Sequence, residues 1–351
     1  MRKKKSDWIK SRNSIAKFLN ADPDDVVLLP NVTTGIVTIL MSIPFKPGDT
    51  ILITNLAFQS TYNACVHILH YFSGVAIKTI RITIPIHSTT QVVNLFREAL
   101  DKDPNIRAVV IDYITCEYAL QLPVEEILDV CQQYTVFTII DGAHAPGQLS
   151  LYLDKMKAEF FTGNFYKWMF APWGCAFVWK NKKVSFPLKS LTSSSPKNDI
   201  LSQFYDQSCR NESCYYSLPT AVHYIRSKGG IERISMYNTR LLQMASEYLV
   251  RLWQTSTLDV PSSMEPPFIR MIRLPKINGF NTSEDDIQSL MDLIYHDHHI
   301  DVCLKSVNDQ LYVRLSVHIY NCLDDYKKLG NAVLLLMEKR RNGNHACSLS
   351  K

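Results

Sequence analysis

The sequence lacks the features of membrane and secreted proteins. No uninterrupted apolar stretch reaches the length of a membrane span. No hydrophobic core follows the basic residues at positions 2–5, so we do not expect them to begin a signal peptide. A solvated chain end explains this basic cluster more simply than a nucleic-acid surface, because the whole chain carries a formal net charge of only +5. We therefore expect neither a membrane nor a nucleic-acid partner.

Paired cysteine motifs are also missing. The nine cysteines are odd in number, scattered, and without the close spacing of zinc or redox motifs. We expect reduced thiols in a cytoplasmic protein. His296, His298 and His299 could hold a metal, but adjacent histidines rarely converge on one ion, and a solvated helix end is the favoured interpretation. We expect no metal site.

The first half of the chain alternates between strand and helix patterns. With 351 residues, 46% of them hydrophobic, it can bury a large domain and a smaller companion. The patterns predict helices at 6–20, 35–43, 62–72, 92–100 and 124–133, and strands at 26–29, 51–54, 75–80, 108–113, 136–140, 160–162 and 175–179. This alternation favours an α/β domain with a mostly parallel sheet, which binds ligands at the carboxyl ends of its strands.

The second half changes character. Residues 180–208 are polar and aperiodic, which predicts an excursion or a loop. Helices are expected at 220–226, 232–253, 284–295 and 324–339, and strands at 268–273, 300–304 and 311–315. We expect a large α/β domain over residues 1–240, a small α+β domain over 241–340 and a disordered tail over 341–351.

Two residues point to pyridoxal phosphate chemistry. Asp141 ends a predicted strand, and Lys167 follows the next strand among aromatic residues. An acid at this place could keep a pyridine nitrogen protonated, and a lysine could hold the cofactor as a Schiff base. An apolar setting disfavours the ammonium ion and favours the nucleophilic amine. Taken singly, Asp141 could be a turn former and Lys167 a surface lysine lying along aromatic rings.

A possible phosphate seat lies where the first strand passes into a helix. Thr33 and Thr34 stand at this junction, where hydroxyls, free N–H groups and the helix dipole would all favour an anion. A plain threonine N-cap is the simpler interpretation of these residues alone.

Together these runs resemble class V aminotransferase-type pyridoxal phosphate enzymes. The resemblance rests on 141–148 (DGAHAPGQ) and 161–179 (FTGNFYKWMFAPWGCAFVW), extends over about residues 12–336, and is greatest for the isopenicillin N epimerase-like and cysteine lyase (desulfhydrase) branch. It implies fold type I, pyridoxal 5'-phosphate as cofactor, an amino-acid substrate, and a homodimer with cofactor sites at the subunit interface.

The resemblance also implies individual roles. Lys167 would form the Schiff base, Asp141 would pair with the pyridine nitrogen, and His144 would support the aspartate or the phenolic oxygen. The other implied residues are Thr33, Thr34 and Asn164 near the phosphate, Phe58 (with Tyr62 in reserve) over the ring, the hydroxyl of Thr115 facing it, and Arg314 as the clamp of the substrate carboxylate.

Three departures from the family pattern stand out. Tyr166 replaces the usual histidine before the lysine, and it can still donate to a phosphate. Ser208-Cys209-Arg210-Asn211 replaces a Gly-Thr-Arg-Asp segment that reaches across to the other subunit. Relatives begin several tens of residues earlier, so we expect a truncated chain or a substrate cleft that is built differently.

The activity expected from the resemblance is carbanion chemistry at the α-carbon of an amino acid. β-Elimination from cysteine or a related thiol amino acid is preferred, on the resemblance alone. An epimerase or an aminotransferase of the same family would share the first steps. A truncated, non-catalytic protein of the same fold is a rival of another class, and a metal-dependent enzyme using the histidine cluster is a second rival.

Overall fold

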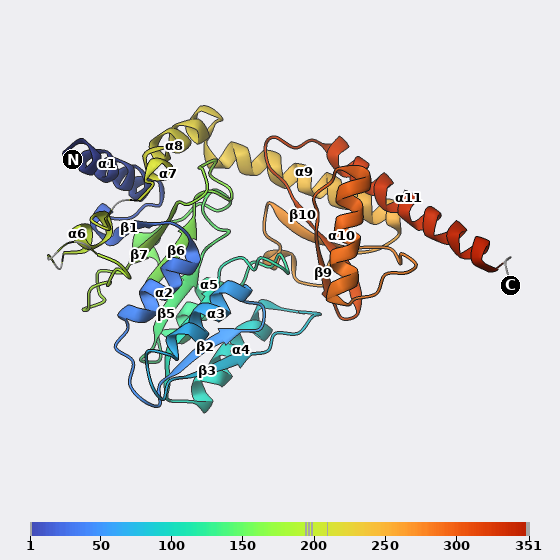
Figure 1. Cartoon of the computed structure of the whole chain (residues 1–351). Coiled ribbons are helices and arrows are strands. Elements are labelled where there is room, and N and C mark those ends of the chain that lie inside the picture. The colour runs from blue at the N-terminus through green and yellow to red at the C-terminus, as the bar shows by residue number, and fades with distance from the viewer. Residues whose placement is uncertain (1, 194, 196, 198, 209, 349–351) are drawn as a thin grey trace. The chain divides into compact units, whose positions relative to one another are not determined.

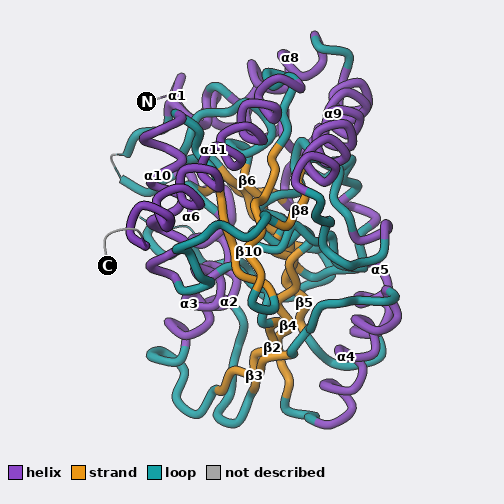
Figure 2. The backbone as a smooth tube through the Cα atoms, turned by 90° about the vertical axis from the view of Figure 1, so that its right-hand side faces the viewer, coloured by secondary structure: helices purple, strands orange, loops and turns teal. Residues whose placement is uncertain are grey.

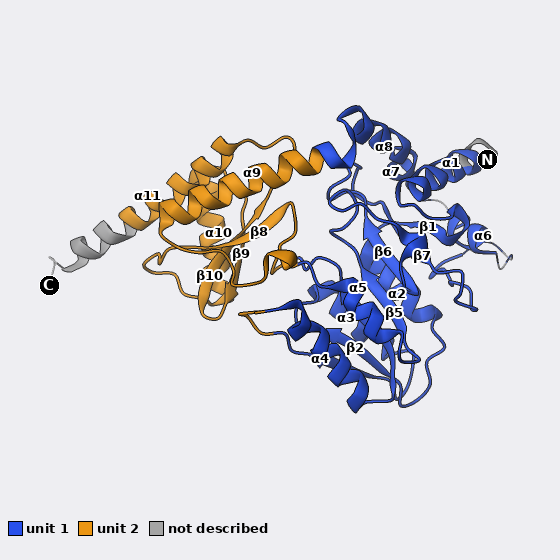
Figure 3. Cartoon of the chain, turned by 180° about the vertical axis from the view of Figure 1, so that it is seen from behind, with its two compact units in different colours: residues 1–82, 88–116, 121–233 blue, residues 83–87, 117–120, 234–351 orange. Residues whose placement is uncertain are grey.

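The computed structural model describes residues 2–193, 195, 197, 199–208 and 210–348, with side chains from residue 5 to residue 339. The chain divides into two compact units (Figure 3). The first comprises Met1–Ile82, Ser88–Cys116 and Gln121–Arg233, and the second Thr83–His87, Glu117–Leu120 and Ile234–Lys351. The expected boundary at 240 lies close to this division, but no sequence pattern indicated that two short segments of the first half join the second unit.

A seven-stranded sheet forms the centre of the first unit (Figure 1). Its strands are β1 (Val26–Leu29), β2 (Thr50–Thr54), β3 (Ala76–Ile80), β4 (Ile106–Asp112), β5 (Phe137–Asp141), β6 (Phe160–Asn164) and β7 (Ala176–Lys180). The strand order is β1-β7-β6-β5-β4-β2-β3. Strands β2 to β6 pair in parallel, and β7 runs antiparallel to both β6 and β1. The predicted α/β class with a mostly parallel mixed sheet is confirmed.

Helices cover both faces of this sheet. Figure 2 shows α2 (Val32–Ser42) and α3 (Gln59–Ile68) on one side of the strands, and α4 (Thr89–Lys102) and α5 (Val124–Cys131) on the other. Burial on both faces explains why β1, β2 and β6 are buried at every position and lack polar alternation. The unit also contains α1 (Arg2–Phe18), α7 (Ser213–Tyr216), α8 (Leu218–Ser227) and the 3-10 turns η1 (Pro23–Asp25) and η2 (Leu153–Lys155).

The segment 180–208 departs from the expected loop. Residues Ile200–Tyr205 form helix α6, which begins where the Asp199 carboxylate accepts a hydrogen bond from Ser202 N at 2.9 Å. Phe204 is fully buried and anchors this helix. A single apolar anchor and one N-cap are too short a signal to appear in hydrophobic periodicity, which explains the wrong prediction.

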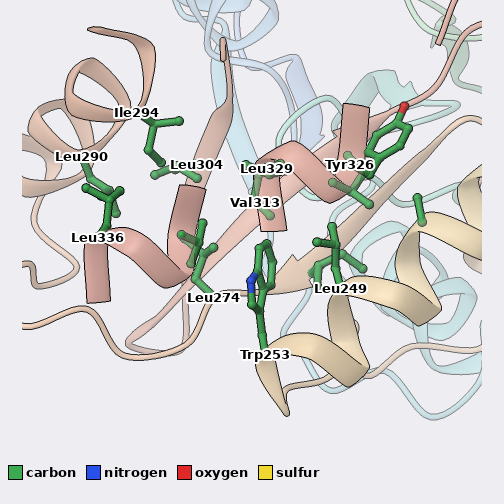
Figure 4. Packing of buried hydrophobic residues seen from close by; sticks show 14 of the residues in the cluster. Leu249, Trp253, Leu274, Leu290, Ile294, Leu304, Val313, Tyr326, Leu329 and Leu336 are labelled. Carbon is green, nitrogen blue, oxygen red and sulfur yellow. The ribbon is translucent and has the colours of Figure 1, made fainter. Parts of the chain in front are cut away.

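A three-stranded antiparallel sheet organises the second unit. Its strands β8 (Ile269–Arg273), β9 (Cys303–Val307) and β10 (Gln310–Ser316) are arranged in the order β8-β10-β9. The 3-10 turn η3 (Ser262–Met264) precedes β8, and the unit's helices are α9 (Gly230–Trp253), which begins just before the division, α10 (Glu284–His298) and α11 (Leu323–Ser348). Figure 4 shows the core, where Leu249 and Trp253 of α9 pack with Val313 of β10 and Leu290 and Ile294 of α10.

Two predictions for this unit need correction. Strand β9 begins at Cys303 rather than residue 300, because the C-cap of α10, His299, is left-handed with φ 54° and the chain needs several residues to turn. Residues 341–348 were expected to be disordered but continue helix α11, and 349–351 lie outside the described residues. None of the described helices combines the length and apolar character that a membrane crossing requires.

Candidate active site

Polar residues of the predicted site gather at the carboxyl ends of three neighbouring strands. The parallel pairing of β4 and β5 places Asp112 opposite Asp141, and Asn164 is the last residue of β6. These strand ends open into a cavity of about 180 Å³. The residues that line the cavity are Val32, Thr33, Phe58, Thr61, Asp112, Ile114, Cys116, Asp141, Ala143, His144, Asn164, Tyr166 and Lys167.

Asp141 is held by two hydrogen bonds at the end of β5. The hydroxyl of Thr61 on α3 donates to Oδ2 at 2.7 Å, and the backbone N–H of Ala143 donates to Oδ1 at 3.0 Å. Both donors favour the ionised carboxylate. Gly142 lets the chain turn here without collision, because a Cβ at this position would lie 2.1 Å from Cζ of Phe161. Burial and these contacts therefore set the orientation of a charged carboxylate.

The two ring nitrogens of His144 are engaged by residues adjacent in sequence. The indole N–H of Trp168 donates to Nδ1 at 3.3 Å, and Lys167 Nζ lies 2.9 Å from Nε2. An indole nitrogen can only donate, so Nδ1 is the unprotonated nitrogen and the imidazole proton is on Nε2. That proton is directed at Nζ, which accepts it with the lone pair of a neutral amine. This contact is the one that a neutral, nucleophilic Lys167 amine would make.

The start of helix α2 differs from the simpler interpretation of the threonine pair. The N-cap is Asn31, whose Oδ1 accepts a hydrogen bond from Thr34 N at 2.8 Å, so the alternative of a threonine cap is wrong. Asn164 Oδ1 accepts from Val32 N at 3.1 Å and ties β6 to the helix. Thr33 lines the cavity, whereas Thr34 lines a different cavity with Pro30.

Of the remaining predicted site residues, Phe58 and Tyr166 line the cavity, whereas Thr115 does not. Phe58 lines the cavity with 40% of its surface exposed, as a stacking ring requires. Tyr166 also lines it, and burial raises the pKa of its phenol, which therefore stays a hydrogen-bond donor. Thr115 is fully buried, and its neighbours Ile114 and Cys116 line the cavity instead.

Arg314 belongs to the second unit. It lies on β10 and lines a cavity of about 290 Å³ within that unit, with Asp301, Asp325 and Tyr326. Its proposed contact with a substrate stays a prediction. Within the ranges that the structure describes, no three His, Cys, Asp or Glu side chains converge as a metal site would require.

The segment that departs from the family's cross-subunit pattern makes local contacts. Arg210 forms an ion pair with Glu212 at 3.3 Å and donates to the carbonyl of Phe204 at 2.9 Å. Cys209, which stands where the family pattern has threonine, lies outside the described residues. The guanidinium of Arg210 is thus held within the first unit by partners close in sequence.

Among the cavity residues that were not candidates in the sequence, three have polar or thiol side chains. Thr61 lies in the first turn of α3, and nothing local indicates that its hydroxyl reaches Asp141 across 80 positions. Asp112 ends a predicted strand just as Asp141 does, which is a usable signal. Cys116 lies four residues beyond the end of β4. Only the path of the folded chain shows that it lines the cavity.

The lining fits the pyridoxal phosphate predicted from the sequence. Lys167 offers a neutral amine to an aldehyde, Asp141 offers a carboxylate to a ring nitrogen, and Phe58 offers an aromatic face. Oδ2 of Asp112 is buried and has no hydrogen-bond partner among the described residues, so a bound group could satisfy it. The residues present therefore match the chemistry of this cofactor.

Comparisons with known proteins agree with this geometry. The model of the family described as Aminotransferase class-V matches residues 3–329. The chain is similar to an L-cysteine desulfhydrase of Arabidopsis thaliana, with 26% identity over 366 residues that cover 93% of this chain and 78% of that protein. It is 25% identical over 168 residues to the isopenicillin N epimerase of Streptomyces clavuligerus, covering 48% of this chain and 42% of that protein.

A solved structure shows the same fold. The complex of the cystine C-S lyase C-DES with its reaction product cysteine persulfide is similar with a TM-score of 0.75 and 16% identity. The likeness covers 95% of this chain and 87% of that chain. At this identity it supports the predicted fold class and nothing finer.

The hydrogen bond from Trp168 generates a prediction about the tautomer of His144. In Trp168→Phe the ring remains but the donor to Nδ1 is lost, so the imidazole proton should redistribute between Nδ1 and Nε2. The ¹⁵N chemical shifts of the His144 ring should move, and the rate of any reaction that needs neutral Lys167 should fall about fivefold, the effect of about one hydrogen bond.

Trp179→Phe is the matched control for this prediction. Trp179 is also buried, but its indole nitrogen has no partner within the described part of the chain. Its replacement should leave the His144 resonances in place. Unchanged ¹⁵N shifts in Trp168→Phe would show that the indole does not set the tautomer.

Proposed function

Because the chain belongs to the class V aminotransferase family, a family of pyridoxal phosphate enzymes, we propose that it releases sulfide from cysteine or a related thiol amino acid by β-elimination. The protein is an enzyme, and its cofactor is pyridoxal phosphate. The structural observation that supports its first step, removal of the α-proton, is the contact of 2.9 Å between Lys167 Nζ and His144 Nε2 in a cavity that Asp141 also lines.

The residues of the chain would divide the work between anchoring and proton transfer. When bound, pyridoxal phosphate supplies an aldehyde for amines and a ring that absorbs the electron pair left at the α-carbon. Lys167 would hold the cofactor through its amine and would accept the α-proton as a neutral base. His144 would favour the unprotonated amine by donating Nε2–H to it. Asp141 would hold the ring nitrogen in its protonated form.

Elimination completes the reaction in the proposed scheme. The Cα–H bond breaks with its proton passing to Lys167 Nζ, the Cβ–S bond breaks, and the sulfur leaves as sulfide with its electron pair. Water then converts the remaining fragment to a keto acid and ammonia. The names of the relatives support this branch, and the geometry of the cavity is compatible with the shared proton removal.

The first test is sulfide release from L-cysteine by the full chain loaded with pyridoxal phosphate. We expect sulfide and pyruvate in equal amounts from the wild type and a loss of at least 10³-fold in Lys167→Ala, because the anchoring amine and the base are the same group. Inversion at the α-carbon without sulfide would identify an epimerase. Transfer of the amino group to a keto acid would identify an aminotransferase.

Arg314 is the proposed partner of the substrate carboxylate. Replacing it in Arg314→Gln removes a bidentate, charge-assisted contact, so the KM for cysteine should rise at least tenfold with a smaller change in kcat. Arg273→Gln is the matched control, since Arg273 is also half-buried and lies on β8, which pairs with β10. An equal KM in the two variants would remove Arg314 from the substrate site.

The proposal includes a homodimer. It is supported by the apolar surface around Trp173, which is 85% exposed and lines a cavity of about 740 Å³ with Leu191, itself 46% exposed. Sedimentation equilibrium should give twice the chain mass of 40.2 kDa. Trp173→Ser should shift the mass toward the monomer, whereas replacing the equally apolar and 73% exposed Met236 by serine should not. A monomeric wild type would refute the dimer.

A further inference from the structure

Two carboxyl groups lie side by side at the bottom of the cofactor cavity. Asp112 and Asp141 are the final residues of β4 and β5 and are register partners in the parallel pairing of these strands. Adjacent strands are about 4.8 Å apart, and paired positions direct their side chains to the same face. Both residues are almost fully buried, with 2% and 3% of their surfaces exposed, and both line the cavity.

The two carboxyl groups differ in their hydrogen-bond donors. Asp141 accepts from the Thr61 hydroxyl and from the Ala143 backbone, so each of its oxygens has a donor. Oδ2 of Asp112 is buried and, among the residues that the structure describes, lacks any hydrogen-bond partner. An ionised oxygen without a donor is costly in such a place, whereas two neighbouring carboxyls can share the site if one keeps its proton.

The other groups around the pair do not reverse this difference. Burial, and next the charge of Asp141, raise the pKa of Asp112 well above its usual range, although hydrogen bonds from the backbone of Asp112 and Phe58 and then the charge of Lys167 oppose them. Cys65 on α3 faces both carboxyls, and burial raises its pKa to about 12, so it stays a neutral thiol. Tyr166, which lines the same cavity, also stays neutral because burial raises its pKa. His144, the remaining titratable group beside Lys167, has Nδ1 and Nε2 engaged as described.

We propose that Asp112 is a neutral carboxylic acid beside the ionised Asp141, and that its Oδ2–H donates a hydrogen bond to the group bound in the cavity. The identity of that group rests on the proposed function, whereas the protonation of Asp112 does not. Asp112 is thus a binding residue for the cofactor, and it adds a donor without adding a second negative charge beside the carboxylate that must hold the ring nitrogen protonated.

The protonation state has a direct spectroscopic signature. Infrared difference spectra of the full chain at neutral pH should contain the carbonyl-stretch band of a carboxylic acid that disappears in Asp112→Asn. Asp292→Asn, a change of an exposed carboxyl on α10, is the control and should leave the band unchanged. A spectrum in which Asp112→Asn removes no such band would overturn the proposal.

The pH dependence of stability provides a second readout. A carboxyl whose pKa is raised by folding contributes stability that is complete below its unfolded pKa of about 4 and is lost as the pH rises through the folded pKa. Relative to the wild type, Asp112→Asn should therefore gain thermal stability as the pH rises from about 4 toward neutrality. A constant difference, like that expected for Asp292→Asn, would contradict a raised pKa.

Cofactor binding tests the donor role. The amide of Asp112→Asn retains a donor of similar shape, so its Kd for pyridoxal phosphate should stay within about threefold of the wild type, while Asp112→Leu should bind at least tenfold more weakly. Equal binding by the leucine variant would overturn the donor role. If the wild type itself fails to bind pyridoxal phosphate, the proposed function and the donor role both fail, and the infrared band still decides the protonation of Asp112.

Discussion

The parallel register of β4, β5 and β6 is the constraint on which the cavity depends. It brings the carboxyl ends of three buried strands to one edge of the sheet and so places Asp112, Asp141 and Asn164 around one space. Two buried acids in adjacent strands would repel each other if both were ionised. The donors from Thr61 and Ala143 resolve this conflict in favour of a charged Asp141.

The environment of Lys167 depends on the hydrogen bonds of His144. Lys167 and Trp168 are neighbours in sequence, yet their side chains reach opposite nitrogens of one imidazole ring. The indole of Trp168 therefore favours the tautomer of His144 that has its proton on Nε2. In that tautomer Nε2–H can donate a hydrogen bond to Nζ of Lys167. Nucleophilicity at Nζ thus depends on a hydrogen bond made on the far side of the ring, by a residue that does not line the cavity itself.

Much of the fold followed from periodicity, and the exceptions have physical causes. All seven strands of the large sheet were predicted near their observed positions, because strands buried on both faces are short apolar runs between turns. Helix α6 was missed because it has only one buried anchor, Phe204. Thr115 was selected for its hydroxyl and stays a prediction; it is buried, and its neighbour Cys116 lines the cavity. A threonine N-cap was the simpler interpretation of the start of α2, whereas the cap is Asn31, which accepts from Thr34 N.

The sequence by itself determined the α/β class, the family and the cofactor, and it predicted Asp141 and Lys167 as the anchors, because these depend on local patterns and on residues close together along the chain. Only the tertiary structure decided that Thr61 orients Asp141 from 80 positions away, that Asp112 is desolvated beside it, and which nitrogen of His144 holds the proton. Local periodicity reports which face of an element is buried. Hydrogen bonds and pKa shifts depend on which distant element packs against that face, and no local pattern contains that information.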